Sequence, residues 1–66
     1  MFRLYAKIPG KKRFLPMDYN AGSVVINLIY ATIFSEVEAT KLKEEIPTLE
    51  EINPGWKFEV RTIKGN

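Results

Sequence analysis

The sequence predicts an α+β fold in which an antiparallel meander of three strands precedes one helix and a fourth strand returns to the sheet, in the order β-β-β-α-β. Apolar and polar residues alternate over residues 2–8 and again over residues 56–63, which is the period of a half-buried strand. Between them, a serine-capped segment carries apolar residues at spacings of three or four, which is typical of a helix that covers one face of a sheet. The 66 residues suffice for one core, so we assign residues 1–66 to a single domain.

The first two strands are predicted to form a hairpin. Residues 2–8 place Phe2 and Leu4 on one side and Arg3 and Tyr5 on the other. The dipeptide at positions 9–10 is Pro-Gly, which favours a type II turn. Residues 13–17 then predict a second strand, in which Pro16 indicates an edge position or a bulge. Residues 18–23 are rich in turn formers and predict a loop.

The third strand is predicted over residues 24–34. This stretch is rich in β-branched and aromatic residues and has apolar side chains on both faces, which is typical of a central, covered strand. One helix can cover only one face of a small sheet. We therefore expect the second apolar face to need another cover.

The helix is predicted to begin at Ser35, because Ser35 and Glu38 have the spacing of a capping box. An apolar stripe follows, formed by Ala39, Leu42, Ile46, Leu49 and Ile52. Pro47 predicts either a kinked helix or a break followed by a second short helix. After an Asn-Pro-Gly turn at positions 53–55, the last strand is expected beside the first strand and parallel to it.

Composition argues against most enzyme classes. The chain has no cysteine and no histidine, so a disulfide, a thiolate nucleophile and the usual proton shuttle are excluded. The paired glutamates at 44–45 and 50–51 are interpreted as a solvated helix face. We expect no catalytic residue, no cofactor and no metal site, and hence no enzyme. The longest apolar stretch, residues 24–34, is shorter than the ~18 residues that a membrane span needs, so we expect a cytoplasmic protein that does not insert into membranes.

Charges are segregated along the chain. Residues 1–34 carry five basic residues and one acidic residue, residues 35–52 carry two basic and six acidic residues, and residues 53–66 carry three basic and one acidic. Such a pattern can create two oppositely charged faces.

The segregation predicts a partner-binding face on the sheet, opposite the helix. If the first and last strands are neighbours, their outward cations surround an aromatic side chain, with more cations in the hairpin and a tyrosine from the third strand. The candidate residues are Arg3, Tyr5, Lys7, Lys11, Lys12, Arg13, Tyr30, Lys57 and Arg61. Cations among aromatics suit single-stranded nucleic acid, but they are also typical of any solvated sheet face. The surplus of apolar side chains favours a protein partner or a second copy of the chain.

Residues 28–36, 41–46 and 53–61 together resemble small proteins of bacterial phages and conjugative elements. In this chain they read LIYATIFSE, KLKEEI and NPGWKFEVR, and the span from residue 28 to residue 61 is about half of its length. The resemblance implies a non-enzymatic inhibitor or regulator that occupies a host protein, such as a CRISPR or other defence effector, in the cytoplasm of a bacterial host cell. It assigns no functional residue. The alternative is a small nucleic-acid-binding protein that uses the basic, aromatic-containing sheet face.

Overall fold

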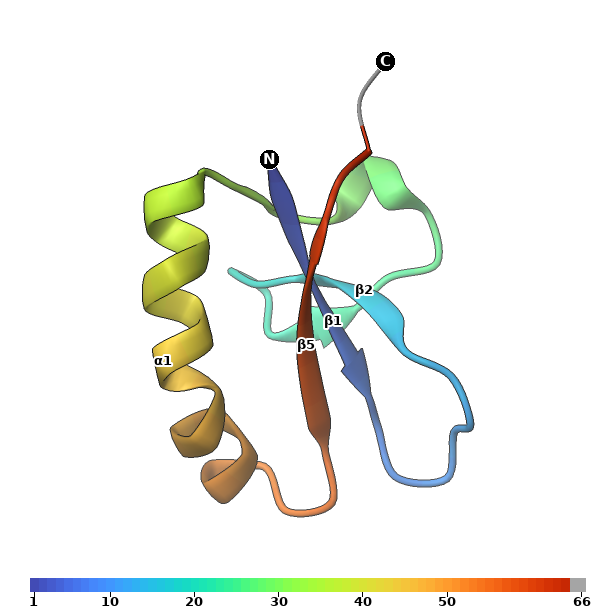
Figure 1. Cartoon of the computed structure of the whole chain (residues 1–66). Helices are drawn as coiled ribbons and strands as arrows, with labels where there is room; N and C mark the ends of the chain where they lie inside the picture. The colour runs from blue at the N-terminus through green and yellow to red at the C-terminus, as the bar shows by residue number, and fades with distance from the viewer. Residues whose placement is uncertain (65–66) are drawn as a thin grey trace.

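A single long helix lies beside an antiparallel sheet in the computed structural model, which describes residues 1–64 (Figure 1). This arrangement confirms the predicted α+β class. In chain order the elements are β1 (Phe2–Lys7), β2 (Leu15–Asp18), β3 (Ser23–Val24), the 3-10 helix η1 (Leu28–Tyr30), β4 (Ile33–Phe34), α1 (Glu36–Ile52) and β5 (Lys57–Thr62).

Strand β1 is the centre of the sheet. β5 pairs with all six residues of β1 along one edge. The other edge is shared: β4 pairs with Phe2 and Arg3, and β2 pairs with Tyr5 and Ala6. β3 pairs in turn with β2, so the first three strands form the predicted meander. The sheet has five strands in the described part of the chain, one more than expected.

The direction of the last strand differs from the prediction. β5 was expected to run parallel to β1, but the two strands are antiparallel. The reason is an additional reversal of the chain between β3 and β4. Because β4 already runs antiparallel to β1, helix α1 returns the chain to a β5 that has the direction of β4.

The prediction of one strand over residues 24–34 is wrong. The segment contains two short strands, β3 and β4, separated by η1. Asn27 explains the interruption, because its side-chain oxygen accepts a hydrogen bond from the Ile29 amide at 3.1 Å and so caps the 3-10 helix. A short polar side chain that bonds nearby backbone in this way competes with a strand ladder.

Of the two alternatives predicted for Pro16, an edge position or a bulge, the edge position is wrong, since β2 lies between β1 and β3. The Pro16 carbonyl accepts a hydrogen bond from the Val25 amide at 2.8 Å, on the β3 side of the strand. The N–H and C=O groups of one strand residue point to the same side, so the missing proline donor removes no bond between β2 and β1.

Helix α1 begins as predicted, and its last turn extends beyond the residues of the stripe that are buried or half-buried. Ser35 and Glu38 form both hydrogen bonds of the capping box, at 3.2 and 2.8 Å. Of the two alternatives predicted at Pro47, the break does not occur, since the helix continues past the proline to Ile52. Ile52 was expected on the buried stripe, but 66% of its surface is accessible.

The core lies between the inward face of the sheet and α1. It is formed by Leu4, Ala6, Met17, Phe34, Ala39, Leu42 and Phe58, and Leu4 is completely buried. The predicted alternation of β1 and β5 is confirmed, because their inward residues are buried or half-buried down to Val60 while the outward ones of β5 are exposed. This leaves the outward face of β1 and β5 without a covering helix.

Candidate functional site

The outward side of β1 and β5 gathers the charged residues that the sequence singled out. The strand register sets Arg3 opposite Arg61, Tyr5 opposite Glu59 and Lys7 opposite Lys57. Directly opposed residues of antiparallel strands share a face of the sheet. We call these six residues the basic face, because four cations oppose one carboxylate there.

Arg61 is held in place above two aromatic rings. Its guanidinium carbon lies 4.4 Å from the centre of the Tyr5 ring and 5.4 Å from that of Phe14. Lys7 Nζ lies 5.9 Å from the same Phe14 ring, and Glu59 forms an ion pair with Arg61. Arginine stacked on aromatic rings is attracted by their π electrons. Phe14, which precedes β2, was not among the residues predicted from the sequence, although its neighbour Arg13 was a candidate.

Arg3 has an unusual environment on the same face. It lies directly opposite Arg61, and like charges in opposed positions destabilise a sheet. Its Nε atom is buried and donates no hydrogen bond to any residue of the described chain. A buried donor without an acceptor costs free energy.

The other candidates lie away from this cluster. Lys11, Lys12 and Arg13 are exposed in the connection between β1 and β2. Tyr30 belongs to η1 rather than to a strand, so it does not share the sheet face with Tyr5 as expected.

A cluster of apolar side chains is exposed over residues 26–33, which we call the apolar segment. The accessible fraction is 97% for Ile26, 76% for Ile29, 63% for Tyr30 and 50% for Ile33. The sequence predicted an apolar face in this stretch that the helix does not cover, but as one side of a long strand; the structure instead exposes these residues on and around η1. Ile33 is opposite Arg3 in the pairing of β4 with β1, and its side chain therefore lies on the outward side of the sheet. The apolar segment is therefore adjacent to the basic face at the pair of Arg3 and Ile33.

The glutamates of α1 include three with structural roles. The backbone amide of Ser35, and secondly its hydroxyl, hold the pKa of Glu38 below its usual 4.5. Burial raises the pKa of Tyr19 above 10.0, and the nearby Glu45 carboxylate, 3.4 Å from the Tyr19 hydroxyl, raises it further. Glu50 accepts a hydrogen bond from the Phe58 amide at 3.1 Å, which blocks part of the outer edge of β5.

Residues 1–64 contain no group of three or more acidic residues placed to hold a metal ion. No helix in this range is both long and apolar enough to cross a bilayer. Searches of protein-family models, curated proteins and solved structures gave no significant match to the chain. The resemblance to proteins of phages and conjugative elements therefore stays a prediction.

Proposed function

We propose that the chain is a non-enzymatic protein-binding domain, and that the apolar segment and the basic face together contact an acidic surface of a partner protein. The observation that carries the proposal is the exposure of Ile26, Ile29 and Tyr30, which lie close together in sequence and largely in solvent. Clusters of large apolar side chains on a surface are typical of interaction sites, protein interfaces among them.

The charge of the adjoining sheet face supports an acidic partner. Three of its four cations, Arg3, Lys7 and Lys57, have no ion pair with a carboxylate of residues 1–64, and Arg61 pairs with Glu59. Charges at the rim of an interface increase the association rate and select the partner more than they add affinity. The apolar segment would supply the dry contact, and the basic face would orient the partner.

Nucleic acid is the alternative, and the arrangement of the aromatic rings favours it less. Base stacking needs an open ring face. The Tyr5 ring is covered by the Arg61 guanidinium, and the same group and Lys7 lie near Phe14. The branched aliphatic side chains of Ile26 and Ile29 offer no surface on which a base stacks.

The biological role that we propose follows from the sequence resemblance. An inhibitor or regulator carried by a phage or conjugative element acts by occupying a host protein in the bacterial cytoplasm, and it needs a contact surface without catalytic groups. A defence effector such as a CRISPR nuclease is a partner of this kind.

The proposal is tested by capture with two matched variants. Ile29→Glu places a carboxylate in the apolar segment, and Val37→Glu makes the same change in charge on α1. The two residues are exposed to a similar extent, 76% and 73%. Immobilised wild-type chain and both variants are incubated with a bacterial lysate, and the bound proteins are quantified by mass spectrometry.

We expect at least one acidic protein that wild type and Val37→Glu bind equally and that Ile29→Glu binds roughly thirtyfold more weakly, since a central contact contributes about 2 kcal/mol or more. Equal retention by both variants would contradict the proposal. Single-stranded RNA binding that Lys57→Ala weakens and Ile29→Glu leaves unchanged would favour the nucleic-acid alternative. A wild-type dimer that Ile29→Glu dissociates would instead make a second copy of the chain the partner.

A further inference from the structure

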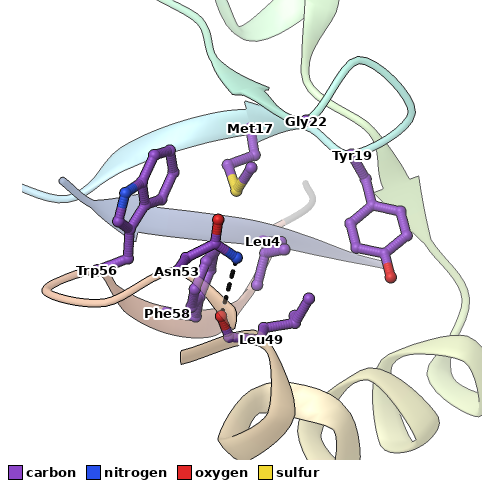
Figure 2. A pocket seen from close by; sticks show the side chains of 8 residues that line it. All are labelled: Leu4, Met17, Tyr19, Gly22, Leu49, Asn53, Trp56 and Phe58. Atoms are coloured by element: carbon purple, nitrogen blue, oxygen red, sulfur yellow. Dashed lines mark hydrogen bonds between the residues drawn. The ribbon is translucent and has the colours of Figure 1, made fainter. Parts of the chain in front are cut away.

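A cavity of about 330 Å³ opens between the inward face of the sheet and the C-terminal half of α1, away from the basic face (Figure 2). Leu4, Met17, Leu49 and Phe58 supply apolar walls. Its volume falls at the lower end of the range of about 300–1,000 Å³ that small-molecule sites occupy. The space is open to solvent, so a ligand can enter it without opening the core.

Two aromatic rings give the cavity a flat wall. Trp56 and Phe58 are stacked, with ring centres 5.8 Å apart and ring planes inclined by 20°. Trp56 lines the cavity and is only half-buried. A planar ring inserted beside this pair would extend the stack.

One polar group is oriented toward this space. The Asn53 amide nitrogen donates to the Leu49 carbonyl at 2.8 Å, and this bond fixes the side chain at the end of α1. The side-chain oxygen is thereby turned the other way, toward Met17 across the cavity (Figure 2). No donor within residues 1–64 bonds to it, so it can accept from a ligand.

The charge of the lining restricts the ligand class. None of the lining residues is lysine, arginine, aspartate or glutamate. An anionic or cationic ligand would lose its hydration without gaining a counter-charge, which is unfavourable.

We propose that this cavity binds a neutral, planar aromatic molecule that donates one N–H or O–H hydrogen bond to Asn53 Oδ1. The ring lies against Trp56 and Phe58, and the apolar side chains of Leu4 and Met17 enclose it. This site is separate from the proposed protein-binding surface, and neither depends on the other.

The test is a titration of ¹⁵N-labelled protein with indole, followed by amide chemical shifts. Indole is flat and neutral and carries an N–H donor; benzofuran has the same shape with an oxygen in place of the N–H. We expect saturable shifts confined to Leu4 and its neighbours in β1 and to residues 17–22 and 49–58. Benzofuran should bind roughly threefold to tenfold more weakly, which corresponds to one net hydrogen bond.

Two variants assign the shifts to the cavity. Leu49→Phe fills part of the space and should abolish saturable binding, whereas Thr48→Phe adds the same ring at the neighbouring exposed position and should leave binding unchanged. Shifts that do not saturate, that map to residues 26–33, or that persist in Leu49→Phe would overturn the proposal. So would equal binding of benzofuran by the wild-type protein, a comparison that requires no variant to fold.

Discussion

Replacing Gly55 with alanine tests how the turn before β5 is built. Gly55 has a φ of +87°, a conformation that side chains disfavour, and a β-carbon there would lie 3.0 Å from Cγ of Pro9 in the turn after β1. The positive φ costs an alanine about 1–2 kcal/mol. The contact adds about 1 kcal/mol, because Cγ of Pro9 can give way only through a change of ring pucker or a shift of the turn.

Gly22→Ala is the matched control for this change. Gly22 also has a positive φ, +69°, but a β-carbon there would meet nothing within 4 Å. Both substitutions reduce the entropy of the unfolded chain equally. The difference between them therefore isolates the contact with Pro9.

The assay is urea unfolding, followed by the fluorescence of the single tryptophan and by far-ultraviolet circular dichroism. A chain of this size is stable by about 3–10 kcal/mol, so a loss of 2–3 kcal/mol for Gly55→Ala is measurable. We expect Gly55→Ala to destabilise by about 1 kcal/mol more than Gly22→Ala, and Pro9→Ala to recover part of the excess. Equal losses for the two glycines would refute the contact between the turns.

Three further predictions concern α1 and the core. Ser35→Ala removes the acceptor for the Glu38 amide and should lower the free energy of unfolding by about 0.5–2 kcal/mol in urea; an unchanged midpoint would place the start of the helix elsewhere. Because the pKa of Glu38 is lowered by folding, its stabilisation is present above its ordinary value of 4.5 and is lost as pH falls through the lower folded value. Glu38→Gln should therefore flatten the dependence of stability on pH between about pH 5 and pH 3, and an unaltered slope would contradict this assignment. Leu4→Ala should cost about 2–5 kcal/mol, since Leu4 is completely buried, and a loss below 1 kcal/mol would mean that the cavity beside it collapses.

The sequence allowed prediction of the elements whose signal is local. The capping box at Ser35 needs only residues three positions apart, and the alternation of β1 and β5 needs only the pattern within each strand. The turn at residues 8–11 is equally local: Gly10 has a φ of +85°, and the Lys11 amide bonds to the Ile8 carbonyl at 3.1 Å.

The features that were not predicted arise from one local cap that the strand-like composition concealed, and from contacts between distant segments. Residues 24–34 have the composition of a strand. The cap formed by Asn27 instead starts the 3-10 helix η1, and Ile26 and Ile29 lie in solvent. That one reversal also changes the direction of β5, because strand direction depends on the number of turns before it. The stack of Arg61 on Tyr5 and Phe14 joins three separate segments of the chain, and spacing along the sequence carries no signal for it.

The shared position of the β1 and β5 candidates was predicted from local signals, whereas the position of Tyr30 was not. Arg3, Tyr5, Lys7, Lys57 and Arg61 share a face because two alternating strands are neighbours, and this adjacency holds whether the strands are parallel or antiparallel. The position of Tyr30 depended on the long third strand, so it changed when that strand was replaced by η1.

The accessibility of the isoleucine methyl groups tests the central claim most directly. A soluble paramagnetic gadolinium chelate broadens the NMR signals of methyl groups in solvent, and it is applied to the free chain and to the chain with a captured partner. We predict strong broadening of Ile26 and Ile29 in the free chain, protection of both in the complex, and no change at Val37 on α1. Protection of Ile26 and Ile29 in the free monomer, or continued broadening in the complex, would contradict the account.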